Sequence, residues 1–210
     1  MVAIRVVEDI GVAEVAEFAR QVGITTKLEE DMALALGASG VRPIELANAY
    51  ATFAAGGRWA PTRLVTRIVA PDGSPVPLPS REPSRDVMEP SEAYVMTHML
   101  RSVVTEGTGS PAQRLERAVV GKTGTSNDTR DAWFIGYAPT VVAGVWVGFD
   151  DQRSLGKRET GTRVALPIWI GVMEAADQTS KETDFALPRG VIVAQIDPAS
   201  GLLAYPGHED

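Results

Sequence analysis

The stretch from Val119 to Tyr137 most constrains what this chain can fold into. Two β-branched residues lead into Gly121-Lys122-Thr123-Gly124-Thr125-Ser126, and the largely apolar run Asp131–Tyr137 follows a short polar stretch. Runs of this kind, separated by polar turn residues, predict two neighbouring antiparallel strands. A third run, Val141–Phe149, continues the series. The sequence therefore predicts an antiparallel sheet of three consecutive strands.

The first of these strands carries groups that suit an extended ligand. Gly124 has no Cβ, so a ligand backbone can come close to it. The hydroxyls of Thr123 and Thr125 can hydrogen-bond a carboxylate, and Lys122 brings a compact positive charge. Main-chain N–H groups along a strand edge can pair with a peptide laid beside it. We therefore predict Lys122, Thr123, Gly124 and Thr125 as substrate-binding residues.

Composition narrows the possible functions. A chain of 210 residues allows one domain, or one domain with a tail. The net charge of −7 and the lack of a basic patch argue against nucleic-acid binding. There are no cysteines, which excludes disulfides, zinc–thiolate sites and thiol catalysis. We expect no metal site at the acidic run of residues 29–31, which has no other ligands nearby and is interpreted as a solvated turn. We also expect no cofactor.

The rest of the chain predicts helices around the sheet, and thus an α+β fold with helices flanking an antiparallel sheet. The expected helices are Val2–Gln21 (bent or broken at Gly11, with Ile4, Val7, Val12, Val15, Phe18 and Ala19 buried), Pro43–Ala55, Pro90–Glu106 and Val164–Ala176. The other expected strands are Arg63–Ala70 with a return at Val76–Leu78, and a hairpin of Val191–Ile196 and Leu202–Tyr205. Residues 23–31 and 75–90 read as loops.

A longer string around the first strand carries a resemblance. Gly121-Lys122-Thr123-Gly124-Thr125-Ser126-Asn127-Asp128, continued by Asp131-Ala132-Trp133-Phe134, resembles the transpeptidase domain of class A, bifunctional penicillin-binding proteins. Further matching segments are Ala35–Tyr50, Gly107-Thr108-Gly109, Val145–Asp150, Glu159-Thr160-Gly161 and Pro167-Ile168-Trp169. The resemblance divides the chain into a transpeptidase portion, residues 1–178, and a short C-terminal extension with a hairpin, residues 179–210.

The resemblance implies roles for the matching residues. Lys122 would steer the substrate carboxylate and help set protonation at the site. Thr123 and Thr125 would bind the terminal carboxylate of a D-Ala-D-Ala stem peptide or of a β-lactam. The N–H of Thr125 would supply half of an oxyanion hole. Asp131 and Trp133 would support the strand and not touch substrate.

Two motifs of the family are missing from the sequence. Its nucleophile lies in Ser-x-x-Lys, where the lysine one helical turn later takes the proton, and a Ser-x-Asn motif follows. No Ser-x-Asn is present, and only Ser154-Leu155-Gly156-Lys157 fits the first pattern. It follows Lys-Thr-Gly where the family has it first, and Gly156 disfavours a helix. We interpret it as a chance match, so the chain has no predicted catalytic residue.

The sequence therefore predicts a fragment of a peptidoglycan D,D-transpeptidase that is inactive alone. The N-terminal part of the domain, a glycosyltransferase domain and a membrane anchor would belong to the parent protein, which would act at the outer face of the cytoplasmic membrane. No signal peptide or membrane span is evident in the sequence. The alternative is a non-catalytic peptide-binding module with the same fold. A relative of serine β-lactamases is disfavoured by the sequence around Trp133.

Overall fold

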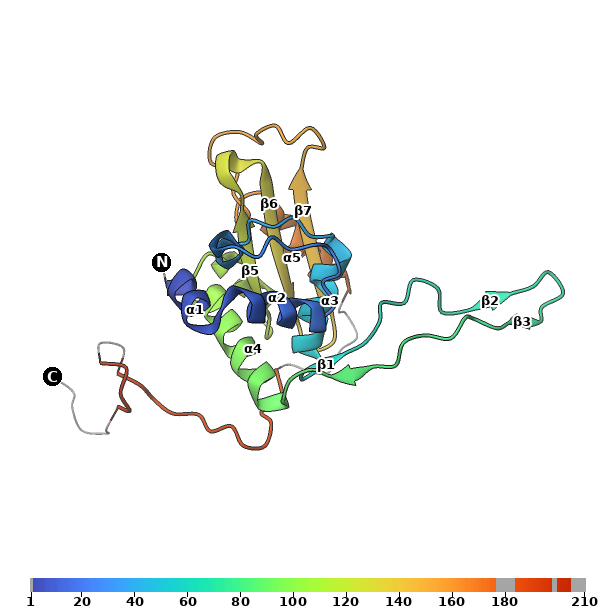
Figure 1. Ribbon diagram of the computed structural model, residues 1–210, viewed down its shortest axis with the longest axis horizontal. Coiled ribbons are helices and arrows are strands. Elements are labelled where there is room, and N and C mark those ends of the chain that lie inside the picture. Colours follow the sequence, from blue (N-terminus) through green and yellow to red (C-terminus); the bar gives the residue numbers. More distant parts are fainter. Residues whose placement is uncertain (1, 177–183, 198–199, 205–210) are drawn as a thin grey trace.

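The centre of the molecule is an antiparallel sheet of three strands in the order β5-β6-β7 (Figure 1). The computed structural model describes residues 2–176, 184–197 and 200–204. The sheet strands are β5 (Val120–Thr125), β6 (Asp131–Tyr137) and β7 (Val142–Gly148). The predicted series of three strands is confirmed. One end of the sheet projects beyond the helices that surround the rest of it (Figure 1).

The two faces of the sheet pack against different helices, because side chains alternate along each strand. On one face, Phe134 lies against Trp169 with ring centroids 4.8 Å apart. On the other face, Tyr137 clusters with Leu100 and Tyr50. The helices that supply these partners are α5 (Ala165–Ala176), α4 (Pro90–Thr105) and α3 (Pro43–Ala54). Helices thus flank both faces, and the predicted α+β fold is confirmed.

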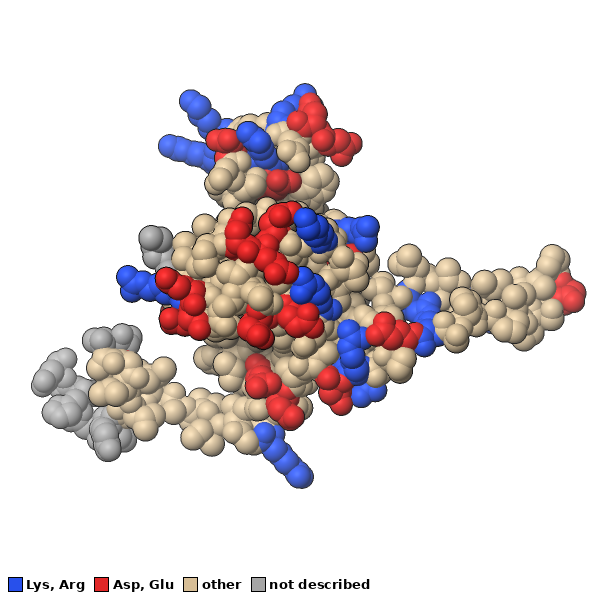
Figure 2. Space-filling view, in the orientation of Figure 1, with Lys and Arg blue, Asp and Glu red and all other residues tan. Residues whose placement is uncertain are grey.

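The predicted N-terminal helix is two helices, α1 (Val2–Ile10) and α2 (Val12–Gln21). Gly11 separates them at φ 101°, a conformation that favours glycine. Of the six residues predicted to be buried, only Val7 is, and Phe18 is 37% exposed. The small side chain of Ala16 is buried instead. These helices lie on the outside of the body, where acidic side chains gather on the face shown in Figure 2.

Residues 23–31 form the predicted loop and are held to α3 by Glu45. The buried Glu45 carboxylate accepts hydrogen bonds from the hydroxyls of Thr25 (2.6 Å) and Thr26 (2.7 Å), and from the Thr26 N–H (3.2 Å). Arg42 donates to the same carboxylate at 3.1 Å. Burial raises the pKa of this carboxyl, but the threonine hydrogen bonds and Arg42 outweigh it and lower the pKa to about 2. A short 3₁₀ helix, η1 (Met32–Leu36), follows the loop.

A long arm extends away from the body between α3 and α4 (Figure 1). At its base β1 (Arg58–Trp59) pairs with β4 (Arg85–Asp86), and near its tip β2 (Ile68–Val69) pairs with β3 (Pro75–Val76). The predicted strands were therefore too long, and β4 lies where only a loop was expected. No second layer covers the arm in the described chain, so its apolar residues do not extend the pairing.

The C-terminal segment returns to the body. Phe185 meets Tyr137 edge-on with ring centroids 5.6 Å apart, and Asp184 forms an ion pair with Arg101 of α4. The predicted hairpin is reduced to one bridge, between Ile196 and Leu203, and part of it lies outside the described residues. The predicted boundary at residues 178 and 179 lies outside them too. No helix in the described residues is long and apolar enough to span a bilayer.

Candidate functional site

The open edge of the sheet is the outer side of β5, which pairs only with β6 among the described strands. The Ser126 N–H donates to the Asp131 carbonyl oxygen at 3.1 Å, one position beyond the Thr125–Ala132 pair. Along an antiparallel ladder, the main-chain groups of successive residues point alternately toward and away from the partner strand. Those of Thr125 and Thr123 therefore point away from β6, toward the open edge.

The Thr123 side chain belongs to a group of three threonines from separate segments. The hydroxyl oxygens of Thr108 and Thr123 lie 2.7 Å apart, and the Thr162 hydroxyl donates to the Thr108 carbonyl at 3.0 Å. Only one of the paired hydroxyls can donate in their contact, so the other keeps its proton for a further acceptor. The pair can therefore offer a hydrogen bond to a carboxylate.

Gly161 joins the loop after β7 to the end of β5. Its N–H donates to the Thr125 hydroxyl oxygen at 3.1 Å, which leaves the hydroxyl proton of Thr125 able to donate. A Cβ on Gly161 would lie 2.3 Å from the Trp133 carbonyl oxygen and 2.7 Å from that of Gly124. Only glycine allows so close an approach to two strand backbones.

Lys122 and Gly124 lie on the opposite face of β5 from Thr123 and Thr125, because side chains alternate. The Lys122 ammonium nevertheless reaches the edge, where it donates to the Thr123 carbonyl at 2.9 Å. A Cβ on Gly124 would lie 3.1 Å from the Trp133 Cβ, so the space beside Gly124 is partly filled by protein. The four predicted residues thus do not form one row on one face. The main-chain groups of Thr123 and Thr125 and the Lys122 ammonium reach the open edge, whereas Gly124 faces Trp133.

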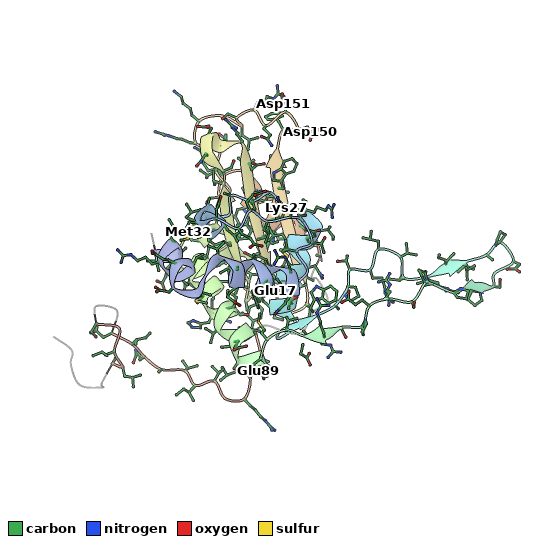
Figure 3. The ribbon with its side chains drawn as sticks, in the orientation of Figure 1. Glu17, Lys27, Met32, Glu89, Asp150 and Asp151 are labelled. Carbon is green, nitrogen blue, oxygen red and sulfur yellow. The ribbon has the colours of Figure 1, made fainter. Side chains whose placement is uncertain are left out.

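Asp131 and Trp133, predicted to support the strand, both contact β7. The Asp131 carboxylate accepts a hydrogen bond from the Trp146 indole N–H at 2.8 Å. The Trp133 and Trp146 rings lie side by side with centroids 6.4 Å apart. These contacts tie β6 to β7 near the projecting end of the sheet. Figure 3 shows Asp150 and Asp151 beyond β7 at the same end.

The Ser154 motif lies in a loop and not on a helix. The Ser154 hydroxyl donates to the Asp128 carbonyl at 2.7 Å and accepts from the Gly156 N–H at 3.2 Å. Gly156 has φ 121°, which interrupts any helix between Ser154 and Lys157. The geometry of a serine with a lysine one helical turn later is therefore absent here. No group of three or more acidic or histidine side chains that could hold a metal occurs in the described residues.

Comparison with known proteins identifies the family. The sequence model described as the penicillin-binding protein transpeptidase domain matches residues 10–167. The chain belongs to the penicillin-binding protein transpeptidase family. The penicillin-binding protein 1A of Aquifex aeolicus is 40% identical over 204 residues, which cover 96% of this chain and 28% of that protein.

Solved penicillin-binding proteins share the fold. Penicillin-binding protein 1A of Haemophilus influenzae superposes with a TM-score of 0.89 at 27% identity, over 98% of this chain and 37% of the other. Penicillin-binding protein A of Mycobacterium tuberculosis, solved as a ceftriaxone acyl-enzyme complex, gives 0.61 at 26% identity, over 77% of this chain and 42% of that one. The predicted resemblance to part of a class A transpeptidase domain is confirmed. The chain spans less than a third of the length of these curated relatives.

Sequence reasoning did not assign site positions to Thr108, Gly161 or Thr162. Each belongs to, or follows directly, a segment that carried the resemblance, Gly107-Thr108-Gly109 or Glu159-Thr160-Gly161. That was the available signal. The structure brings these segments together beside β5, although they are 15 to 54 residues apart in sequence from their partners.

Proposed function

We propose that this chain supplies the carboxylate-binding half of a peptidoglycan D,D-transpeptidase and lacks the acylated serine. The proposal is supported by three contacts along the edge strand β5: the Lys122 ammonium at the Thr123 carbonyl, the paired hydroxyls of Thr108 and Thr123, and the Thr125 hydroxyl that accepts from the Gly161 N–H. An ammonium group and hydroxyl donors together suit the terminal carboxylate of an extended peptide. The outward main-chain groups of β5 suit the peptide backbone.

The chemistry that follows is acyl transfer. The scissile carbonyl of a D-Ala-D-Ala peptide, placed along β5, would develop negative charge on its oxygen when attacked. The Thr125 N–H, which points to the open edge, would donate to that oxygen. The second donor and the attacking hydroxyl would come from a Ser-x-x-Lys segment outside this chain. The parent protein would also carry the glycosyltransferase domain and act outside the cytoplasmic membrane.

Titration with a peptide carboxylate tests the binding step. N-acetyl-D-alanyl-D-alanine should bind saturably, and its C-terminal amide should bind at least about tenfold more weakly, because the charged hydrogen bonds are lost. Lys122→Met should weaken the acid about threefold to tenfold. Lys157→Met removes the same charge from an exposed loop and should have no effect. Equal binding of acid and amide would refute the proposal.

Acylation tests the missing nucleophile. A labelled penicillin should leave no covalent adduct on the intact chain by mass spectrometry. An adduct on any serine, Ser154 included, would overturn this part of the proposal. A non-catalytic module would bind the same peptide and also resist acylation. Adjoining in-frame codons for Ser-x-Asn and Ser-x-x-Lys would identify the fragment, and their absence would identify the module.

A further inference from the structure

The projecting end of the sheet carries a cluster that the carboxylate site does not use. Asp131 and Trp133 are two residues apart on β6 and so share a face. Trp146 stands opposite Trp133, and Gly148 stands opposite Asp131. Gly124 of β5 is the partner of Trp133 on the other side. Two indoles and one carboxylate therefore lie together, next to the strand that we propose binds substrate.

Three features fix the Trp146 ring flat on the sheet. Its N–H donates to the Asp131 carboxylate at 2.8 Å. A Cβ on Gly148 would lie 2.4 Å from the ring, so the indole lies directly over this glycine. Trp133 flanks it at 6.4 Å with the ring planes inclined by 49°. Trp146 remains 39% exposed, so the ring is held in place by its neighbours but not covered within the described chain.

The chemistry of this cluster selects a cation. Indole faces attract ammonium groups, and tryptophan does so most strongly among the aromatic residues. The carboxylate adds a negative charge at the edge of the ring, and its second oxygen has no hydrogen-bond partner in the described structure. The cations next to the cluster in sequence or on the adjoining strand have other contacts: Lys122 of β5 donates to the Thr123 carbonyl, and Arg130, the residue before β6, pairs with Asp128 at 3.2 Å.

We infer that Asp131, Trp133 and Trp146 bind an alkylammonium group. If the proposed acyl transfer is correct, that group is the side-chain amine of the acceptor peptide. Neighbouring strands lie about 4.8 Å apart, so an amine over Trp133 lies two strand spacings, about 10 Å, from a donor peptide laid along the outer edge of β5, and the site would hold the acceptor before the transfer step. The inferred site rests on the proposed function only for this assignment. Binding of the ammonium group itself does not depend on it.

The indole N–H signals of the full chain in a ¹⁵N–¹H correlation spectrum test the inference. The probe is Nα-acetyl-L-lysine amide, and Nα-acetyl-L-norleucine amide is the neutral match. We expect saturable shifts of the Trp133 and Trp146 signals with the lysine probe. The buried Trp59 and Trp169 should not respond, and they report whether each variant is folded. The norleucine probe should bind at least about fivefold more weakly.

Variants separate a specific site from general charge attraction. Asp131→Asn keeps an oxygen for the Trp146 N–H but removes the charge, and should weaken the lysine probe about threefold to fivefold. Trp146→Leu should weaken it about threefold to tenfold. Asp150→Asn removes the same charge from the neighbouring loop and should change nothing. Equal binding of both probes, or equal effects of the two aspartate substitutions, would overturn the inference.

The same samples distinguish failure of the ammonium site from failure of the proposed carboxylate site. N-acetyl-D-alanyl-D-alanine should bind Asp131→Asn as it binds the unaltered chain. Loss of lysine-probe binding with retained binding of the acid supports the ammonium site. If the acid fails to bind while the lysine probe binds as expected, the proposed carboxylate site is wrong and the ammonium site stands. Absence of saturable lysine-probe shifts in the unaltered chain refutes the ammonium site alone.

Discussion

Substitution of Glu45 by glutamine should test how the loop at residues 23–31 is held to the body. The change preserves the size of the side chain and removes its charge. Glu45 accepts three hydrogen bonds from Thr25 and Thr26 and forms an ion pair with Arg42 at 3.1 Å. One carboxylate oxygen takes both the N–H and the hydroxyl of Thr26. An amide NH₂ in that position would face the Thr26 N–H and could not accept from it.

The expected loss is about 2 kcal/mol at neutral pH. Hydrogen bonds to charged groups contribute about 1.5–3 kcal/mol each, and neutral ones about 0.5–1.5 kcal/mol. Glutamine keeps one oxygen as an acceptor, so the hydrogen bond from the Thr25 hydroxyl is weakened and the one from the Thr26 N–H is lost. Arg42 is largely exposed, and its ion pair adds at most about 1 kcal/mol. Against a typical domain stability of about 5–15 kcal/mol, such a loss is readily measured.

The loss should depend on pH in a defined direction. The pKa of Glu45 is about 2 in the folded chain, below its ordinary value of 4.5. A lowered pKa means that the unfolded chain takes up the proton first, so the contribution is complete above about pH 4.5 and disappears as the pH falls toward 2. Glutamine does not titrate. The stability difference between the two proteins should therefore shrink between about pH 5 and about pH 2.

Urea unfolding followed by tryptophan fluorescence at several pH values measures this difference. Glu17→Gln is the control, because the exposed Glu17 side chain forms an ion pair with the exposed Arg20 at 3.3 Å; it should change stability by less than about 0.5 kcal/mol. Faster hydrogen exchange at the Thr26 N–H would locate the effect. Unchanged stability of Glu45→Gln at neutral pH would refute the reasoning. A loss that is the same at every pH would show that packing, and not charge, holds the loop.

Three further substitutions test other contacts. Gly161→Ala should cost more than about 2 kcal/mol in urea unfolding, because its Cβ would meet two carbonyl oxygens. Gly171→Ala is the control: its Cβ would have nothing within 4 Å, so it should be neutral or stabilise the chain by up to about 1 kcal/mol. Equal effects of the two substitutions would contradict the close approach. Burial raises the pKa of Tyr50 and of Tyr137 to about 12, so ultraviolet titration should show that these two phenols ionise late. The free energy of unfolding should fall as the pH rises from 10 toward 12. Thr97→Val should cost about 1–3 kcal/mol, because it removes the hydrogen-bond partner of the Tyr137 hydroxyl. Phe185→Ala should speed proteolysis of residues 184–204 through loss of the Tyr137 contact, whereas Leu187→Ala, at a 51% exposed side chain, should not; equal rates would show that Phe185 does not anchor the segment.

Local sequence pattern predicted the elements that bury one face against a partner layer. The run Asp131–Tyr137 is largely apolar and follows a polar stretch, so its strand is recognisable without any neighbour. The same reasoning predicted too long a strand at Arg63–Ala70, where only Ile68–Val69 forms one, because apolar content alone does not supply a second layer. It also misjudged Phe18, which is 37% exposed on an outer helix while Ala16 is buried. Periodicity identifies the inward face of a helix only when the helix packs along its length.

The sequence by itself determined the family, the strand of Lys122, Thr123 and Thr125, and the mismatch of the Ser154 motif in its order relative to that strand. These follow from short motifs whose spacing is fixed along the chain. Only the tertiary structure decided that Thr108, Gly161 and Thr162 join this strand, that the outward main-chain groups belong to Thr123 and Thr125, and that Asp131 holds the Trp146 indole. The physical reason is that such contacts depend on strand register and loop closure. Neither is encoded in the local alternation of side chains.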